Sequence, residues 1–139
     1  MDQSNVERWQ NHSVRFLEMV FRGGKRERLR CPDGYGKVTR PCGDTVEIFL
    51  TVRDGHLDSA AFETNGCLYS LACASTVVHL AEGRTLSEAW EISPTEVLDY
   101  LETLPEHEKH CADLAVAGLR AALLNVQENA RNPWKKFYR

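Results

Sequence analysis

Residues 44–64 read DTVEIFLTVRDGHLDSAAFET, and this stretch decides the fold. Every second side chain in its first half is apolar and falls on one side of the chain, namely Val46, Ile48, Leu50 and Val52. Alternation with a period of two is typical of a half-buried β-strand. Asp54 and Gly55 then supply a two-residue turn, so residues 56–64 are predicted to form the returning strand of a hairpin.

The segments around this hairpin predict one further strand and several helices. A short strand at about residues 35–40 would complete an antiparallel sheet of three strands. Apolar residues at helical spacing predict helices over residues 3–21, 68–82 and 110–130. The capping boxes TLSE and SPTE predict two short helices between the last two of these. This order of elements predicts an α+β fold, a small antiparallel three-stranded sheet covered by helices on one face.

Length and composition predict a single domain over residues 1–139. The chain is 42% hydrophobic and 27% charged, which suffices for one buried core. Its first residues, MDQSNVERWQ, are polar, and no apolar run approaches a membrane span, so we expect a cytoplasmic protein without a membrane segment.

Charge is divided unevenly along the chain. Lys and Arg number 9 against 5 Asp and Glu in residues 1–40, 3 against 14 in residues 41–113, and 5 against 1 in residues 114–139. The basic residues of this first segment have no aromatic residues between them for stacking on bases, and they stand beside an acidic body. They are Arg22, Lys25, Arg26, Arg28 and Arg30, within the stretch FRGGKRERLR. We therefore expect no nucleic-acid partner, and interpret this stretch as a solvated loop or a protein-docking strip.

The cysteines point to reduced thiols. They are Cys31, Cys42, Cys67, Cys73 and Cys111. Their odd number, wide separation and lack of a CxxC pair disfavour a disulfide framework. Cys73 is interpreted as a core residue and Cys31 as a surface thiol.

Three of these cysteines occupy the ends of predicted elements. Cys42 precedes a strand, Cys67 precedes a helix, and Cys111 lies at the start of another helix, where the helix dipole favours a thiolate. Asp44 and His110 add an oxygen and an imidazole beside the sulfurs, a mixture suited to zinc or an iron-sulfur cluster. Spacing alone leaves open the alternative that all three are buried thiols.

Longer strings carry a family resemblance over about residues 34–127. They are GKVTRPCGDTVEIFLTVRDGHLDSAAFETNGCLYSLACAS, then EGRTLSEA, then LPEHEKHCADLAVAGLRAAL. With CGD, GC and HC at these separations, the chain resembles the iron-sulfur cluster assembly scaffolds of the IscU family and the N-terminal domain of NifU. Residues 1–33, an N-terminal helix and basic loop, and residues 128–139, a basic-aromatic tail, lie outside the resemblance.

The resemblance implies a ligand set and a function. Cys42, Cys67 and Cys111 match the cysteines that bind the cluster, Asp44 matches the nearby carboxylate, and His110 matches the histidine before the last cysteine. Family members also bind zinc at these positions. Cys111 matches the usual acceptor of persulfide sulfur from a cysteine desulfurase. The resemblance thus implies a scaffold rather than an enzyme, which assembles a transient [2Fe-2S] cluster and transfers it to acceptor proteins.

Two alternatives and two departures accompany this interpretation. The alternatives are a zinc-dependent sulfur acceptor of the SufU type and a structural zinc module.

Where bacterial relatives have LPPVK, the segment recognised by an Hsp70-type chaperone, this chain reads LPEHE and ends the segment on Glu108. Chaperone docking in that form is therefore not carried over. The usual ENPRN segment near the N-terminus is also absent.

Overall fold

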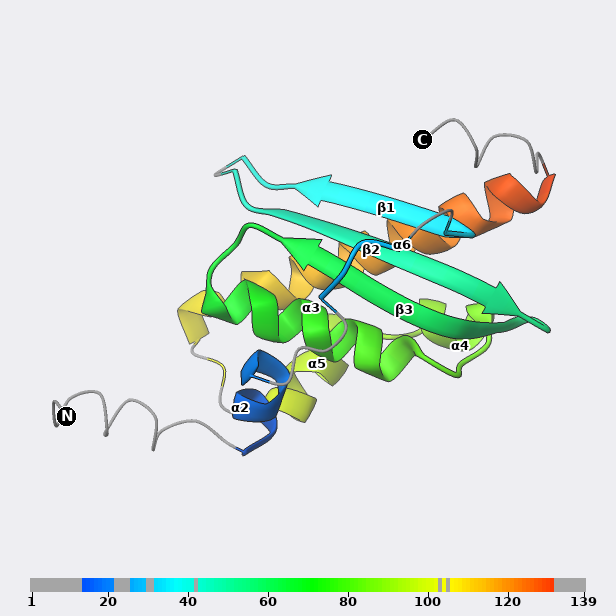
Figure 1. Cartoon of the computed structure of the whole chain (residues 1–139). Coiled ribbons are helices and arrows are strands. Elements are labelled where there is room, and N and C mark those ends of the chain that lie inside the picture. Colours follow the sequence, from blue (N-terminus) through cyan, green and yellow to red (C-terminus); the bar gives the residue numbers. More distant parts are fainter. Residues whose placement is uncertain are drawn as a thin grey trace, which may run out of the picture.

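The computed structural model describes residues 14–21, 26–29, 32–41, 43–102, 104 and 106–131. Its sheet contains β1 (Gly34–Thr39), β2 (Thr45–Arg53) and β3 (His56–Thr64) in the order β1-β2-β3, with both neighbouring pairs antiparallel (Figure 1). The register places Ile48 opposite Gly36 on one side and Phe62 on the other. The hairpin and the third strand expected from the sequence are therefore confirmed.

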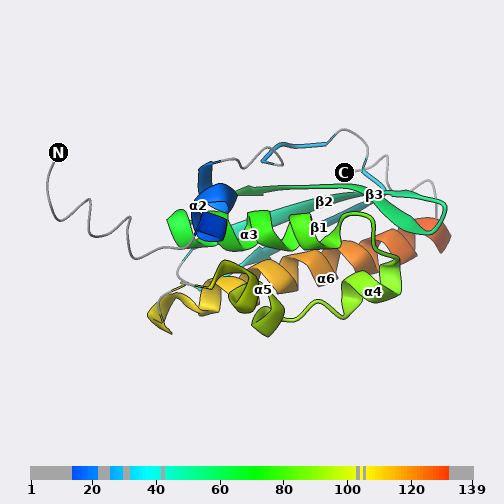
Figure 2. The ribbon, with the colours of Figure 1, turned by 90° about the horizontal axis from the view of Figure 1, so that it is seen from below.

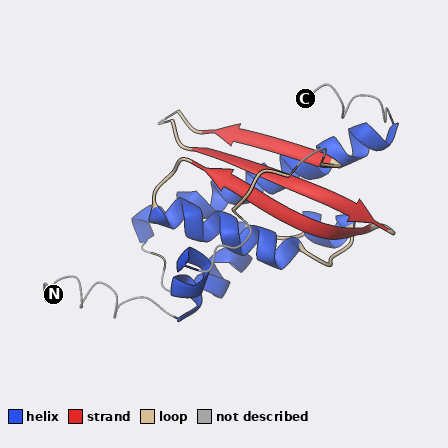
Figure 3. Ribbon diagram, in the orientation of Figure 1, coloured by secondary structure: helices blue, strands red, loops and turns tan. Residues whose placement is uncertain are grey.

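The helices follow one another in the order expected and lie to one side of the sheet (Figure 3). They are α2 (Val14–Phe21), α3 (Leu68–Ala81), α4 (Leu86–Trp90), α5 (Pro94–Leu101) and α6 (His110–Arg131), with a 3-10 turn η1 (Glu106–Glu108) before α6. Thr85 and Glu88 form both halves of the expected capping box. The second expected capping box is only half formed: the Ser93 hydroxyl accepts from the Glu96 amide at 3.3 Å, with Pro94 in the first turn. The Glu96 carboxylate instead accepts from the Arg84 guanidinium at 2.8 Å. The part of the first predicted helix before residue 14 lies outside the described residues.

The elements form three layers, seen edge-on in Figure 2. The sheet is one layer, α3 and α6 pack on one of its faces, and α4 and α5 lie beyond those two helices. Ile48 and Phe62 from the sheet are fully buried with Val77 from α3 and Leu119 from α6. This is the one-sided helical cover that the sequence predicts, and it fixes the positions of the helix ends.

Helix α6 lies unusually close to β1. A Cβ atom added at Gly36 would stand 2.6 Å from the carbonyl oxygen of Gly118, and one at Gly34 would meet the backbone of Ala122 at 2.5 Å. Glycine on the strand therefore allows the helix backbone to rest directly on the sheet. This contact fixes the position of α6 on the sheet, and with it the position of the first turn of the helix.

The other face of the sheet is partly covered by residues 26–29. Arg26 forms an isolated parallel bridge with Phe62 at the edge of β3 and an ion pair of 2.8 Å with Glu63. Arg28 pairs with Glu47 and lies 5.2 Å above the Phe49 ring, which is only 3% exposed. Thus Arg26 and Arg28 pack on this protein's own sheet, because acidic side chains and an aromatic ring project from that face.

The remaining basic residues of that stretch, Arg22, Lys25 and Arg30, lie outside the described residues, as do the aromatic residues of the tail. Within the part of the chain that the structure describes, no helix is long and apolar enough to cross a membrane.

Candidate metal and cluster site

Three chain segments meet at the end of the molecule where α3 and α6 begin (Figure 1). They are the β1–β2 connection, the loop between β3 and α3, and the start of α6. Asn65 joins the first two, since its side-chain oxygen accepts from the Thr45 amide at 2.8 Å and its side-chain nitrogen donates to the Gly43 carbonyl at 3.4 Å. Arg40 joins the first and third, because its guanidinium donates to the His110 carbonyl at 3.4 Å.

The PCGD turn has a backbone that requires glycine. Gly43 has a φ of 98° and donates its amide to the Arg40 carbonyl at 2.9 Å, while the Arg40 amide donates to the Asp44 carbonyl at 2.8 Å. Positive φ is readily accessible to glycine alone. Cys42, which the sequence places in the ligand set, lies outside the described residues, as does Cys31.

Cys67 and Cys111 come together although they are far apart in the sequence. Their sulfur atoms and a carboxylate oxygen of Glu108 all lie within 4.8 Å of one another. The Cys111 Sγ donates to Glu108 Oε2 at 3.6 Å. Two sulfurs and a carboxylate oxygen form a donor set that suits zinc or an iron-sulfur cluster.

Ser70 connects the two cysteines from the first turn of α3. Its hydroxyl donates to Cys111 Sγ at 3.4 Å and lies 3.8 Å from Cys67 Sγ. The side chain is buried, so this hydroxyl is held between the sulfurs. A hydroxyl in that position can donate to a thiolate once a metal has displaced the thiol proton.

The flanking residues predict that Cys67, beside apolar Leu68 and Tyr69, is harder to reach than Cys111, which follows a polar loop. The structure shows the opposite. Cys67 is the N-cap of α3 and is exposed, whereas Cys111 is only 1% exposed. Burial raises the pKa of Cys111 to about 12, with further raising by Cys67 and Glu108 and partial compensation by the Ser70 hydroxyl. Desolvation thus outweighs the helix dipole, and Cys111 carries its proton at neutral pH.

The other two ligand candidates stand near this group but outside it. His110 Nε2 lies 3.9 Å from Glu108 Oε2, and its side chain is 37% exposed. Asp44, the last residue of the PCGD turn, is half-buried. Among the residues that the structure describes, neither belongs to the set whose ligand atoms all approach within 4.8 Å.

Glu108 is the residue that sequence reasoning missed as a ligand candidate. In the sequence it is conspicuous only as the residue at which the chain departs from the lysine of LPPVK. The available signal was its spacing of three residues before Cys111, because residues three apart around a helical turn face the same way. Cys73, by contrast, is fully buried in the core as predicted, and burial raises the pKa of its thiol.

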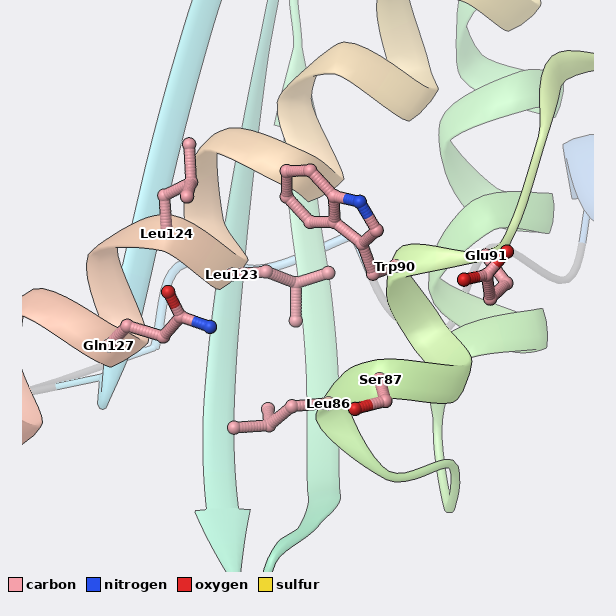
Figure 4. A pocket seen from close by; sticks show the side chains of 7 residues that line it. All are labelled: Leu86, Ser87, Trp90, Glu91, Leu123, Leu124 and Gln127. Atoms are coloured by element: carbon pink, nitrogen blue, oxygen red, sulfur yellow. The ribbon is translucent and has the colours of Figure 1, made fainter.

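A shallow groove of 330 Å³ lies at the opposite end of α6. Figure 4 shows its lining, which includes Leu86 and Trp90 from α4 and Leu123 from α6. Leu123 follows Cys111 by about 18 Å along the helix axis, at 1.5 Å per residue. The groove is therefore separate from the cysteine site.

Sequence relatives of this chain carry the name of cluster assembly scaffolds. Two iron-sulfur cluster assembly scaffold proteins of Archaeoglobus fulgidus, IscU 1 and IscU 2, are 36% identical over 99 residues, which cover 70% of this chain and 65% of each relative. The IscU scaffold protein of Escherichia coli is 37% identical over 96 residues, covering 68% of this chain and 74% of the relative. The chain thus spans slightly less than two thirds of the archaeal proteins' length.

Solved structures share the fold. A putative cluster assembly scaffold for the SUF system from Fervidobacterium islandicum superposes with a TM-score of 0.66 at 15% identity, covering 82% of this chain and 97% of that one. The N-terminal part of a NifU-like protein from Brucella abortus gives 0.61 at 22% identity, covering 84% and 94%. The model of the NifU-like N terminal domain matches residues 23–132, beyond both ends of the resemblance found from motifs. On this match and these relatives, the chain belongs to the NifU-like N-terminal domain family, which includes the IscU scaffolds.

Proposed function

We propose that this protein is an iron-sulfur cluster assembly scaffold. The observation that carries the proposal is the meeting of Cys67, Cys111 and a carboxylate at one end of a fold belonging to this family. Relatives at 36–37% identity bear the name of cluster assembly scaffolds. The protein would then hold and pass on a cluster instead of turning over a substrate.

In the proposed mechanism, Cys111 accepts sulfur from a cysteine desulfurase. The Cys111 sulfur attacks the terminal sulfur of the donor's persulfide as its thiol loses its proton, the donor's sulfur-sulfur bond breaks, and the departing donor cysteine takes up that proton. Each transferred sulfur becomes sulfide by taking two electrons from an external reductant. Iron and sulfide then form a [2Fe-2S] cluster on Cys42, Cys67 and Cys111.

Asp44 and His110 complete the proposed ligand set. A carboxylate oxygen is a weaker partner than a thiolate for an iron-sulfide core, so Asp44 would keep the cluster labile enough for transfer to an acceptor protein. Zinc occupies the same residues in the cluster-free protein. The chemistry requires reduced thiols, which supports a reducing compartment such as the cytoplasm.

Anaerobic reconstitution with metal analysis tests this function. We expect added iron and sulfide to produce a thiolate-to-iron absorption band while any bound zinc is released, with two irons and two sulfides per cluster. Cys111→Ser should abolish the band, and Cys73→Ser serves as a control because Cys73 lies in the core. Retention of zinc without an iron band would instead support the zinc-dependent sulfur acceptor.

A further inference from the structure

We propose that Glu108 is a direct metal ligand of this site, supplying a carboxylate oxygen beside the sulfurs of Cys67 and Cys111. The inference rests on the proposed function, since it assumes that the site binds zinc or a cluster. It goes further by adding a ligand outside the set Cys42, Asp44, Cys67, His110 and Cys111.

Interatomic distances support direct ligation. Zinc binds cysteine sulfur at about 2.3 Å and carboxylate oxygen at about 2.1 Å, so the edge joining sulfur and oxygen in a tetrahedral site is about 3.6 Å. The separation between Cys111 Sγ and Glu108 Oε2 is 3.6 Å. The two atoms therefore already span such an edge. The Cys67 sulfur lies within 4.8 Å of the other two ligand atoms. The edge between two sulfurs of a tetrahedral zinc site is about 3.8 Å, so Cys67 would need to move by at most about 1 Å when a metal binds.

Local structure holds Glu108 in this position. It ends the η1 turn, directly before α6, and its side chain is only 21% exposed. The same carboxylate approaches His110 Nε2 at 3.9 Å. Glu106 in the same turn is 88% exposed and pairs with Lys109 at 2.9 Å. Two glutamates of one turn thus differ in role, and Glu106 provides a matched control.

The chemical result is a mixed sulfur-oxygen site. Cys67, Cys111 and Glu108 supply three ligands of a tetrahedral centre, which leaves one position for a residue of the proposed set or for incoming sulfur. Ser70 would donate to the Cys111 thiolate from outside the metal, replacing the hydrogen bond that it now makes to the thiol. The substitution that removes the lysine of LPPVK therefore adds a ligand.

Cobalt and zinc binding to the full chain test the assignment without depending on cluster assembly. Glu108→Gln keeps the size of the side chain but removes its charge, and we expect it to weaken zinc binding at least about tenfold in competition with a chromophoric chelator. Glu106→Gln should bind as the wild type does. The intensity of the near-ultraviolet thiolate-to-cobalt band grows with the number of thiolates bound to cobalt. Glu108→Cys should raise this intensity by the contribution of one more thiolate, whereas Glu106→Cys should leave it unchanged.

A His110→Ala background separates direct ligation from an indirect effect. If Glu108 acted only by orienting His110, Glu108→Gln would weaken zinc binding in the wild type but would have no further effect in His110→Ala, and the proposal would be overturned. Unchanged affinity in Glu108→Gln would overturn it as well. Circular dichroism of each variant checks that it is folded. Glu106→Cys adds the same extra thiol to the chain, so a band that grows only in Glu108→Cys does not come from non-specific cobalt binding by an added cysteine.

Failure of the wider function would look different. If Cys111→Ser prevents cobalt binding while both Glu108 variants behave as the wild type, the site stands and only the role of Glu108 falls. If the wild type itself binds neither cobalt nor zinc through its cysteines, both the proposed function and this ligand assignment fall.

Discussion

A buried thiol makes the folded protein less stable as the pH rises into the alkaline range, and Cys73 is the simplest case. It is fully buried, and loss of water around it raises its pKa. An unfolded chain exposes this thiol and releases its proton above a pH of about 8.5, whereas the folded protein keeps the proton. The unfolded state then binds fewer protons, so the stability contributed by the buried thiol is complete below pH 8.5 and is lost as the pH rises.

Cys73→Ala removes the part of this dependence that Cys73 contributes, while the part from buried Cys111 is common to both proteins. We expect the difference in unfolding free energy between wild type and Cys73→Ala to shift against the wild type by about 1.4 kcal/mol per pH unit above 8.5. Urea denaturation at pH 7.5, 9 and 10 measures it. A difference that stays constant across these three values would show that the thiol ionises in the folded protein.

The second prediction at the residue scale concerns Cys67 and Cys111. Free iodoacetamide should alkylate exposed Cys67 well before Cys111, which is buried and protonated. A docked desulfurase should reverse this order, because Cys111 is the proposed acceptor of its sulfur. Mass spectrometry of peptides after incubation with desulfurase and cysteine, without iron, should find the first added sulfur on Cys111. Sulfur on Cys67 with Cys111 unmodified would contradict the assignment.

At the scale of elements, the contact between α6 and β1 determines where Cys111 lies. Gly36→Ala would place a Cβ against backbone atoms of Gly118 and Ala121, at 2.6 and 2.9 Å. Backbone cannot yield as a flexible side chain does, so we expect a loss of about 3 kcal/mol in unfolding free energy. Displacement of α6 should weaken zinc binding at the same time.

Gly55→Ala is the control for that prediction. Gly55 has a φ of 77° and no atom within 4 Å of an added Cβ, so the substitution introduces only backbone strain of about 1 kcal/mol. It lies in the β2–β3 turn, away from the cysteines. Equal destabilisation by the two substitutions, measured by thermal unfolding, would mean that α6 can move off the strand without penalty.

Elements were more predictable from sequence than the site. Strict alternation, a two-residue turn and the helix-start residues Thr85 and Ser93 are local signals, and the structure has a strand, a hairpin and two helix starts at these places. The surroundings of Cys111 are not local, because its burial depends on how α6 packs against α3 and the sheet. Helix position alone therefore gave the wrong direction for its pKa. The sequence likewise does not indicate that Glu108 approaches Cys67, because the tertiary fold brings the loop after β3 and the η1 turn together.

At the scale of the whole molecule, the core is built from apolar side chains of the sheet and helices. Ile48, Phe62, Val77 and Leu119 are all fully buried. We therefore expect removal of metal by a chelator to leave the far-ultraviolet circular dichroism and a cooperative unfolding transition in place. Loss of helical signal upon chelation would indicate a structural zinc module, since metal binding would then supply the folding energy.

Transfer of a cluster to an acceptor tests the central claim most directly. The protein is loaded anaerobically with a desulfurase, cysteine, iron and a reductant, separated from these reagents, and mixed with an apo [2Fe-2S] ferredoxin, while visible circular dichroism follows both proteins. We predict that the scaffold's signal decays as the ferredoxin's signal grows, and that Cys111→Ser forms no transferable cluster. A wild-type protein that assembles no cluster, or that keeps its cluster in the presence of excess acceptor, would contradict the account.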